Sequence, residues 1–479
     1  MNKSMVRYLL SKLLLIEASL MLIPVIVAFI YHEDIRVINS LVITIGMLVI
    51  IGLLGVAFKP KNYHVYTKEG LLIVALCWIL WSFFGALPFV LSGQIPSIID
   101  AFFEMVSGFT TTGAPIVPDV AVLSHSLLFW RSFAHLIGGM GVLVFALAIM
   151  ENSKNSHLEV MRAEVPGPVF GKVVSKLKET AQILYVIYLS MFAILVVILM
   201  VAGMPAFDSV ITAMGCAGTG GFGVYNDSIA HYNSSLITNI VSIAVLLFGI
   251  NFNLYYFLLL RKFKAFFKDE ELRTYIGIVM IATALIWLNV SGLYPSTGKA
   301  LENSLFEVAN VMTTTGFGVT DLTVWPLFAQ VILLFLMFVG GSAGSTAGGI
   351  KVMRTLILTK IARNQVLSTL YPHRIMTIHI NEQPLDKEIQ HGVLKYLTLY
   401  VFLLLGLTLM LSLDNNNFMV VVSAATSTFN NIGPMLGTSQ TFAIFSPFSK
   451  LLMSFAMIAG RLEIYPMLLL FIPKTWSKY

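Results

Sequence analysis

The sequence contains few charged residues. Asp, Glu, Lys and Arg make up 11% of its 479 residues, whereas hydrophobic residues make up 57%, and the mean hydropathy is +0.85. A soluble domain of this length needs a much larger polar surface to stay dissolved. The composition therefore excludes a soluble globular protein and predicts a membrane protein that crosses the bilayer many times.

Cysteine is almost absent, and the groupings that enzymes need are not recognisable. The two cysteines, Cys77 and Cys216, lie in apolar stretches without CxxC spacing, which predicts free thiols rather than disulfides or a metal site. We recognise no Ser/His/Asp grouping, metal-ligand cluster or pair of buried carboxylates. A membrane enzyme acting on a lipid-linked substrate would need such a cluster at the membrane surface. The sequence therefore predicts neither an enzyme nor a resident cofactor.

Ten apolar segments are long enough to cross a bilayer, which takes roughly 20 residues. They cover residues 8–31, 36–58, 70–92, 124–150, 180–203, 236–260, 274–293, 325–358, 394–413 and 447–473. The first segment has the basic flank of a signal peptide. It also contains Glu17 and is followed at once by the second segment, so we interpret it as a retained span.

The basic residues indicate the orientation, because Lys and Arg accumulate in cytoplasmic loops. With ten spans, most of the 30 basic residues fall on one side, at both termini and in alternate connections. Both termini are therefore expected in the cytoplasm, with the protein in the cell's inner membrane. The net charge of +6 reflects this bias and does not indicate nucleic-acid binding.

The connections on the opposite side are acidic, which favours cation entry from outside. Their acids are Asp100, Glu104, Asp119, Asp208, Asp227, Glu302, Glu307, Asp321 and Asp414, with Lys299 as the main basic residue. Two of these acids, Asp100 and Asp208, precede short apolar segments at the place where a helix N-cap is expected. Capping a helix and attracting cations are compatible roles.

Four short glycine-bearing stretches recur between the spans. They read Thr-Thr-Thr-Gly-Ala, Gly-Thr-Gly-Gly-Phe, Thr-Thr-Thr-Gly-Phe and Asn-Asn-Ile-Gly-Pro, with equivalent glycines at Gly113, Gly221, Gly316 and Gly433. The segments before the first and third glycines also match, which aligns Glu104 with Glu307. Irregular backbone at membrane depth is tolerated only where protein or water surrounds it. Each copy therefore predicts a short helix that enters the membrane and stops at a loop.

A ring of such loops has the chemistry of a potassium site. A dehydrated potassium ion needs oxygen atoms in place of its water, and backbone carbonyls supply them without full charges. Successive carbonyls can point at one axis only if some residues adopt φ > 0, which glycine does at little cost. The short helices also aim their partly negative C-terminal ends at the ion. One such motif would more often be a plain turn. Four of them, all on the same predicted side and each within a span–helix–loop–span unit, predict an ion pore.

The sequence resembles the Trk/Ktr/HKT superfamily of potassium transporters. The resemblance rests on the four repeated loops, the Gly-Phe after the second and third, the stretch GGSAGSTAGGIK at residues 340–351, and Ala459-Gly460-Arg461 in the last span. It covers nearly the whole chain. The extra helical pair before the first repeat makes the Trk branch the closer likeness.

The resemblance implies which residues hold potassium. The implied filter residues are Thr111, Thr112, Gly113, Gly220, Gly221, Thr314, Thr315, Gly316, Asn431, Ile432 and Gly433. Because the fourth loop departs from the Thr-x-Gly pattern, the ring cannot be fourfold identical. This departure weakens the expectation that sodium is strictly excluded.

Residues 340–349 interrupt an apolar segment that is too long for one straight span. Each glycine disfavours continuous helix by about 1 kcal/mol relative to alanine, so a break near the midplane is expected. A nucleotide-binding loop is disfavoured, since Lys351 is out of the Walker position and no strand precedes it. A close helix-packing surface of small residues is an alternative. The resemblance implies an obstruction under the filter, made of weakly held glycine backbone, with gate residues Gly340, Gly341, Gly344, Gly348 and Gly349.

Arg461 lies inside the last apolar segment, where a charge is expensive and usually functional. Glu463 is only two residues away and does not share its helix face. One alternative is an ion pair with an acid of another span or with Glu463 of a neighbouring molecule. The resemblance instead favours a gate role, with the charge in the pore below the filter, where it limits cation flux. Arg131 and His135 share one helix face and remain unassigned.

We therefore predict an all-α polytopic membrane protein, with an N-terminal helical pair and four span–pore-helix–span repeats of pseudo-fourfold symmetry around one ion pore. The predicted boundaries are 1–62 for the pair and 63–155, 176–265, 272–366 and 392–479 for the repeats.

The predicted function is potassium uptake across the inner membrane. The alternative is a secondary carrier that couples potassium to sodium or protons, which would need ionisable groups at the midplane. The resemblance also implies a homodimer and a cytoplasmic NAD/ATP-binding regulatory ring of the TrkA type. The basic residues within 351–395 are the expected docking surface for that ring.

Overall fold

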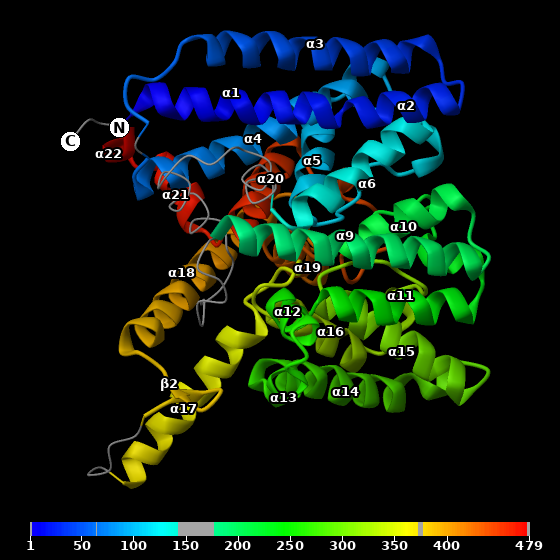
Figure 1. The fold of residues 1–479 in the computed structure, drawn as a ribbon. Helices are drawn as coiled ribbons and strands as arrows, with labels where there is room; N and C mark the ends of the chain where they lie inside the picture. The colour runs from blue at the N-terminus through cyan, green and yellow to red at the C-terminus, as the bar shows by residue number, and fades with distance from the viewer. Residues whose placement is uncertain (1, 64, 142–176, 372–376, 477–479) are drawn as a thin grey trace.

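The computed structural model describes residues 2–63, 65–141, 177–371 and 377–476, and its helices pack side by side in one bundle (Figure 1). The architecture is mostly helical, as predicted. The end of the predicted span 124–150 lies outside the described residues, as does most of the basic connection that follows it, including Lys154, Arg162, Lys172 and Lys176.

The first third of the chain forms a helical pair followed by a longer unit. Helices α1 (Lys3–Leu20) and α2 (Leu22–Ile30) form one nearly continuous run, and α3 (Ile35–Ala57) returns beside them at the top of Figure 1. The elements that follow are α4 (Thr67–Ser92), the short helix α5 (Ile98–Phe109), the 3-10 helix η1 (Val120–Val122) and α6 (His125–Gly139).

The middle of the chain alternates long helices with short ones. The elements are α9 (Leu177–Val201), α10 (Ala206–Gly218), η2 (Ser228–Tyr232), α11 (Ser235–Phe248), α12 (Phe252–Leu259), α13 (Phe263–Lys268), α14 (Glu270–Val290), η3 (Ser291–Leu293), α15 (Thr297–Met312), η4 (Leu322–Val324) and α16 (Leu327–Val339).

The last part of the chain begins with an arm that leaves the bundle. Helix α17 (Val352–Leu370) and the antiparallel strands β1 (His379–Ile380) and β2 (Gln383–Pro384) project at the lower left of Figure 1. The chain then returns through α18 (Lys387–Leu411), α19 (Phe418–Asn430), η5 (Phe442–Ile444), α20 (Pro447–Arg461), α21 (Tyr465–Phe471) and α22 (Pro473–Trp476).

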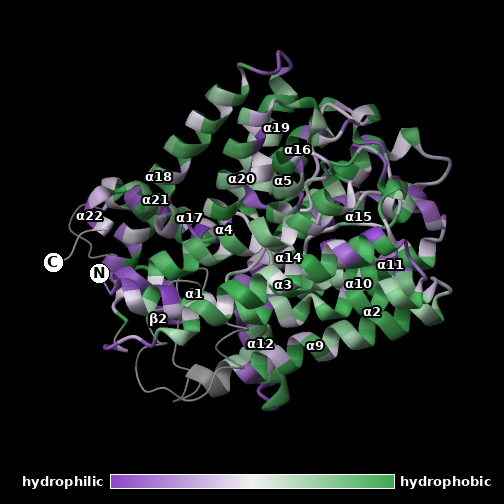
Figure 2. Ribbon diagram, turned by 90° about the horizontal axis from the view of Figure 1, so that it is seen from above, coloured by the Kyte–Doolittle hydropathy of each residue, from purple (hydrophilic) through white to green (hydrophobic). Residues whose placement is uncertain are grey.

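Among the described residues, six helical runs are long and apolar enough to cross a membrane. They are Lys3–Ile30, Ile35–Ala57, Thr67–Ser92, Ala181–Val201, Glu270–Leu293 and Lys387–Leu411. Helices such as α2 and α9 are coloured as hydrophobic along almost their whole length in Figure 2. Only 22% of the most apolar window of Ala181–Val201 is buried within the chain. A helix that is apolar on its outer face as well as its inner one belongs in lipid.

Three of the ten predicted spans are interrupted rather than continuous. The predicted break in 325–358 is confirmed, since α16 ends at Val339 and α17 begins at Val352. The predicted spans 236–260 and 447–473 are also interrupted, which the sequence does not predict. The first bends by 90° between α11 and α12, where the Asn251 side chain accepts a hydrogen bond from Asn253 N and starts a new helix. The second breaks at Glu463 and Ile464, which both adopt φ > 0.

The two ends of the described chain lie at the same side of the bundle. Asn2 N donates to Glu69 Oε1 at the start of α4 (2.9 Å), and Lys68 Nζ donates to Lys474 O in α22 (2.9 Å). Figure 1 likewise shows α1 beginning near α22. An even number of membrane crossings between the two ends fits this arrangement.

Two glycines of α3 allow the N-terminal helical pair to pack closely. A Cβ atom on Gly55 would lie 1.8 Å from Ser11 Oγ, and one on Gly52 would lie 2.6 Å from Leu15 Cδ2. Gly46, on the same helix, has nothing within 4 Å of that position. Small residues at a helix crossing let the two backbones approach, which strengthens association where lipid offers no hydrophobic driving force.

We expect Gly55→Leu to separate α1 from α3 and to lower the free energy of unfolding by about 1–3 kcal/mol, since overpacked contacts cost this much. Gly46→Leu is the matched control. It should be neutral or stabilising by up to about 1 kcal/mol, because glycine weakens a helix. Thermal unfolding in detergent measures both. Equal melting temperatures for the two variants would contradict this account of the packing.

Candidate functional site

Four short helices deliver the four glycine loops to the middle of the bundle. Helices α5, α10, α15 and α19 each end at a loop, and the loops bear Gly113, Gly221, Gly316 and Gly433. The expected N-cap roles of two acids are wrong. Ser97 caps α5 and Pro205 precedes α10, so Asp100 and Asp208 lie in the first turn instead.

The loop backbones alternate in handedness in the same way in all four copies. Each glycine adopts φ > 0, with values of 70°, 71°, 85° and 108° in chain order. The residue two positions earlier is also left-handed in every loop: Thr111 (φ 56°), Thr219 (53°), Thr314 (56°) and Asn431 (59°). Non-glycine residues rarely adopt this conformation unless the surroundings enforce it. An alternating backbone of this kind can turn successive carbonyls to one side, as an ion-binding ring requires.

The four loops meet in chain order and close into a ring, which we call the four-loop ring. In each case a Cβ atom added to the loop glycine would collide with a carbonyl oxygen of the next loop, at the residue just before that loop's own glycine. The contacts are Gly113 with Gly220 O (1.7 Å), Gly221 with Thr315 O (2.0 Å), Gly316 with Ile432 O (2.3 Å) and Gly433 with Thr112 O (2.7 Å). The eight sequence-predicted residues at these two positions therefore lie together, and no side chain fits at the glycines.

Loops one and three are built alike. The Thr110 and Thr112 hydroxyls are 2.7 Å apart, and those of Thr313 and Thr315 are also 2.7 Å apart. Thr110 Oγ1 and Thr313 Oγ1 each donate to a carbonyl one turn back in their helix. These bonds fix the threonines that precede the loop glycines.

Loops two and four differ from this pattern, as the sequence predicts. Asn431 Nδ2 donates to Thr112 Oγ1 (2.9 Å) and to Met457 O (2.8 Å), so the fourth loop is tied to the first. Gly433 N donates to Ser427 Oγ (3.0 Å). In the second loop, Thr219 Oγ1 donates to Gly218 O (2.6 Å). The four-loop ring is therefore asymmetric in its hydroxyl and amide groups.

Two buried glutamates bind the backbone that follows the first and third loops. Glu104 Oε2 accepts a hydrogen bond from Ile116 N (2.9 Å), and Glu307 Oε1 accepts one from Val319 N (3.2 Å). Both donors lie three residues after a loop glycine. The sequence alignment of Glu104 with Glu307 is the signal of this shared role, but an acidic outer mouth was predicted instead. That prediction is wrong for these two residues, since both side chains are buried and bind backbone.

Arg131 and His135 connect the first and second loops. The Arg131 Nε atom lies 2.7 Å from Glu104 Oε1, and its guanidinium lies over the Phe222 ring at 3.7 Å. His135 Nδ1 is 2.8 Å from Gly108 O, and a Cβ on Gly220 would lie 2.4 Å from the His135 ring. A cation over an aromatic face is stabilised when it is desolvated. Arg131 and His135, for which the sequence predicts no role, thus support the ring.

Several other acids around the loops also have local partners. Asp100 Oδ1 pairs with the buried Lys450 Nζ (2.7 Å), and Glu302 pairs with Lys299 (2.7 Å). Tyr232 donates to Asp208 Oδ2 (2.8 Å). In the exposed connection before α19, hydrogen bonds from Ser446 hold the pKa of the Asp414 carboxyl below its usual value, so Asp414 stays ionised. The side of the bundle that bears these acids is less acidic than the sequence predicts, because Lys450 neutralises Asp100 and Lys299 neutralises Glu302.

The glycine-rich stretch, residues 340–349, lies directly against the four-loop ring. Gly348 N donates to Thr314 Oγ1 (2.6 Å) and Gly349 N donates to Asn430 O (3.1 Å). A Cβ on Gly348 would lie 2.1 Å from Asn430 O. These contacts join the stretch to the third and fourth loops at the ends of their helices.

The same stretch is also bonded on its other side. Ser342 N donates to Gly249 O (3.0 Å), and Phe252 N donates to Gly344 O (3.0 Å). Gly340, Gly344 and Gly349 adopt φ > 0, and Gly341 packs on Ala347. The expectation of a weakly held glycine backbone is wrong, because the small side chains let the stretch exchange many hydrogen bonds with the elements around it.

Arg461 lies where the ends of three elements converge. Its Nη1 atom donates to Thr346 O (2.7 Å), and its Nη2 atom donates to Gly138 O (2.6 Å) and Gly139 O (2.8 Å). Glu463 pairs with Arg354 instead. The guanidinium therefore joins the glycine-rich stretch to the end of α6 from the end of α20.

Oxygen atoms of the backbone and of hydroxyl groups dominate the centre of the site. No group of three or more His, Cys, Asp or Glu side chains is placed to hold a metal ion within the part of the chain that the structure describes. A ring of neutral oxygens suits a weakly held monovalent cation that must also leave.

Comparisons with known proteins give a consistent result. The family model described as "TrkH: Cation transport protein" matches residues 38–478. The chain is 33% identical over 476 residues to the Trk system potassium uptake protein TrkH of Salmonella typhimurium, covering 97% of this chain and 98% of that protein. It is 31% identical to TrkG of Escherichia coli K12, covering 95% of each chain. The crystal structure of the potassium transporter TrkH from Vibrio parahaemolyticus matches with a TM-score of 0.89, 30% identity and 100% of both chains.

We expect Glu104→Ala to lower the free energy of unfolding by about 3–5 kcal/mol, because it leaves the Arg131 charge buried without its carboxylate. Glu302→Ala removes the more exposed pair with Lys299 and should cost about 1 kcal/mol or less. Thermal unfolding of the two purified variants measures the difference. A Glu104→Ala protein as stable as Glu302→Ala would show that the buried pair does not brace the ring.

Proposed function

The chain belongs to the TrkH family of cation transport proteins, and from this premise we propose that it takes up potassium through the four-loop ring. The family and the fold are those of a cation transport protein and not of an enzyme. The close approach of each loop glycine to a carbonyl oxygen of the next loop supports a cation site at the ring. The relatives that match along nearly the whole chain are named as potassium uptake proteins of the Trk system.

The carbonyl oxygens of the ring replace the water of a potassium ion that enters it. The proposed ligands come from the loop glycines, the residues before them and the left-handed residues two positions earlier. They are Thr111, Thr112, Gly113, Gly220, Gly221, Thr314, Thr315, Gly316, Asn431, Ile432 and Gly433, to which the backbone alternation adds Thr219. A negative cell interior drives each ion inward with about 2.3 kcal/mol per 100 mV.

The ring discriminates potassium from sodium through a set of unequal ligands. The first and third loops offer threonine hydroxyls, the second offers Gly220 at the same position and the fourth offers Ile432. Selectivity depends on the number and field strength of the oxygens around the ion. We therefore expect a preference for potassium that is weaker than that of a fourfold identical ring.

Residues 340–349 and Arg461 form the gate below the ring. The stretch is bonded to the helix ends of loops three and four, and the Arg461 charge lies between that stretch and α6. Opening displaces Gly340, Gly341, Gly344, Gly348 and Gly349 from these contacts. We propose that a cytoplasmic NAD/ATP-binding regulatory ring of the TrkA type controls this step by docking on the basic residues of 351–395.

The remaining parts of the proposal concern assembly and orientation. The protein is a homodimer in the inner membrane, and both of its ends lie in the cytoplasm. The shared location of the two ends fits the position of α1 and α22 at one side of the bundle. The units are an N-terminal pair, residues 1–62, and four repeats, residues 63–155, 176–265, 272–366 and 392–479. The four short helices with their loops support this division.

A second candidate is a carrier that couples potassium to sodium or protons. The buried Glu104, Arg131 and His135 beside the ring are ionisable groups of the kind that such coupling uses. Potassium flux into liposomes, measured with and without sodium or proton gradients, separates the candidates. Flux that follows the potassium gradient and the voltage alone supports the pore, whereas flux that requires a second gradient supports the carrier.

We expect Gly316→Ser to reduce the preference for potassium over sodium by on the order of tenfold, equivalent to about 1.4 kcal/mol of differential binding. Gly316 has φ +85° and no room for a Cβ, so the serine displaces its carbonyl. Gly318→Ser, two residues away with nothing within 4 Å, is the control and should keep the preference. Reversal potentials under bi-ionic conditions measure both. An unchanged ratio in folded Gly316→Ser would remove Gly316 from the filter.

We expect Arg461→Ala to raise cation flux by more than about tenfold. Two unit charges about 8 Å apart repel by about 2 kcal/mol at an effective dielectric constant of 20, and the substitution removes this repulsion. Arg461→Lys keeps the charge and should change flux little. Flux per folded molecule, together with the melting temperature, provides the test. Lower stability without any gain in flux would assign Arg461 to packing alone.

A further inference from the structure

One buried carboxylate binds both ends of the break between α16 and α17. Glu271, in the first turn of α14, accepts hydrogen bonds at Oε1 from Ala343 N (2.6 Å) and from Met353 N (3.0 Å). Ala343 belongs to the glycine-rich stretch, and Met353 lies in the first turn of α17. The Glu271 side chain is buried. A carboxylate that binds a backbone N–H makes a stronger hydrogen bond than a neutral acceptor.

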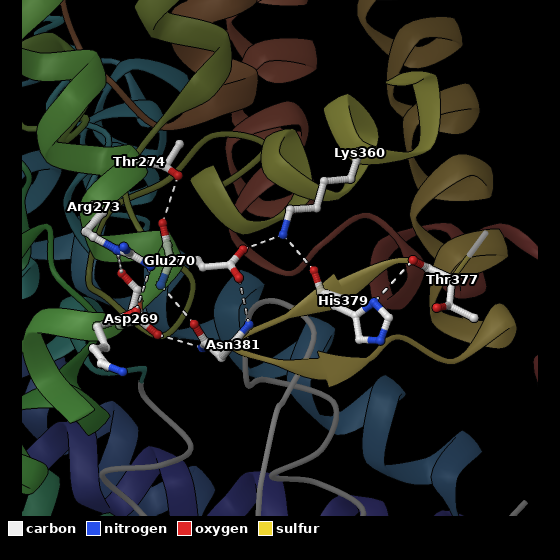
Figure 3. Close-up of polar contacts among 9 residues, drawn as sticks. Asp269, Glu270, Arg273, Thr274, Lys360, Thr377, His379 and Asn381 are labelled. Carbon is white, nitrogen blue, oxygen red and sulfur yellow. Dashed lines mark hydrogen bonds and ion pairs between the residues drawn. The ribbon is translucent and has the colours of Figure 1, made fainter. Parts of the chain in front are cut away.

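The residue next to it attaches the hairpin of the projecting arm to the same place. Figure 3 shows Glu270 between Lys360 of α17 and Asn381 at the tip of the β1–β2 hairpin. Glu270 N donates to Asn381 Oδ1 (2.8 Å), and Asn381 N donates to Glu270 Oε1 (3.2 Å). Lys360 Nζ pairs with the Glu270 carboxylate and also donates to His379 O (2.6 Å). Asn381 Nδ2 donates to Asp269 Oδ2 (2.8 Å).

The hairpin also packs on the residues that Glu271 binds. A separate small hydrophobic cluster joins Ala343 and Met353 to residues of α17, of the hairpin and of α18. Its buried members are Ala343, Met353, Ile357, Ile378, Ile380, Leu385 and Val393. The hairpin is therefore attached through Glu270 to the residue beside Glu271, and through this cluster to Ala343 and Met353 themselves.

We infer that Glu271 is the positioning residue of the glycine-rich stretch and that the β1–β2 hairpin is the lever that acts on it. The inference rests on the proposed function, in which this stretch is the gate. Glu271 holds the stretch against the four-loop ring, and a partner that moves the hairpin releases it. Coupling of this kind requires a discrete element that both sites contact, and residues 343–353 are that element.

The test measures potassium flux into liposomes that hold the purified full chain with no cytoplasmic partner. We expect Glu271→Ala to raise this basal flux by about tenfold, because the two backbone hydrogen bonds to its carboxyl oxygen are lost. Glu271→Gln keeps an oxygen at the same place and should remain close to the intact protein. Glu388→Ala, an exposed acid in the first turn of α18, is the control. The potassium-to-sodium ratio should not change, since the ring is untouched.

A second measurement reports the position of the stretch without transport. Ser345→Cys places a thiol in the buried stretch, and the native Cys77 and Cys216 are both buried. A membrane-impermeant maleimide should label this thiol faster in Glu271→Ala than in the parent. If Glu271→Ala does not fold, Ile380→Ala, which loosens the hairpin from Ala343 and Met353, should raise flux and labelling instead.

The outcomes separate the inference from the function on which it rests. Unchanged flux and unchanged labelling in a folded variant overturn the positioning role of Glu271, while the intact protein still conducts potassium. Faster labelling without potassium flux in any variant overturns the proposed function but supports the positioning role. Equal gains in flux for Glu271→Gln and Glu271→Ala would also overturn the positioning role, because the oxygen that Gln retains would then make no difference.

Discussion

The architecture depends on the absence of a side chain at four points. At each loop glycine, backbone of one loop and a carbonyl oxygen of the next approach so closely that a methyl group cannot fit. Such an approach places many backbone dipoles around one axis, which is unfavourable unless a cation compensates it. The short helices, the interrupted spans and the glycines in the helices that follow the loops all make this approach possible. Gly138 and Gly460, for example, pack on the carbonyls that end α5 and α19.

Ionisable side chains form hydrogen bonds with this backbone from outside the ring. Glu104 and Glu307 accept hydrogen bonds from the chain just after a loop, Arg461 donates to carbonyls beneath the loops, and Glu271 binds both ends of the break. Burying a charge costs free energy unless it is paired or hydrogen-bonded. Here the hydrogen-bonding groups of irregular backbone at membrane depth need partners, and these side chains supply them.

The sequence predicts the parts of the fold that repeat. The four loop glycines, the helices before them and the break at residues 340–349 all follow from local composition. The bends at residues 249–251 and at Glu463 do not, because each depends on backbone conformations or caps that apolar composition conceals. Partners that are distant in sequence were also missed, such as Lys450 with Asp100 and Arg131 with Phe222. Thr219 was missed as a ring residue, although it stands two positions before its loop glycine, as Thr111 and Thr314 do in the first and third loops.

The four-loop ring is expected to bind a cation among its carbonyl oxygens. Crystals of the protein soaked in rubidium or thallium salts, which replace potassium and scatter anomalously, would reveal such an ion. An anomalous peak is expected on the axis of the ring, among the carbonyl oxygens of the residues that precede the four glycines. A protein that transports potassium but shows its anomalous peaks only elsewhere would contradict this expectation.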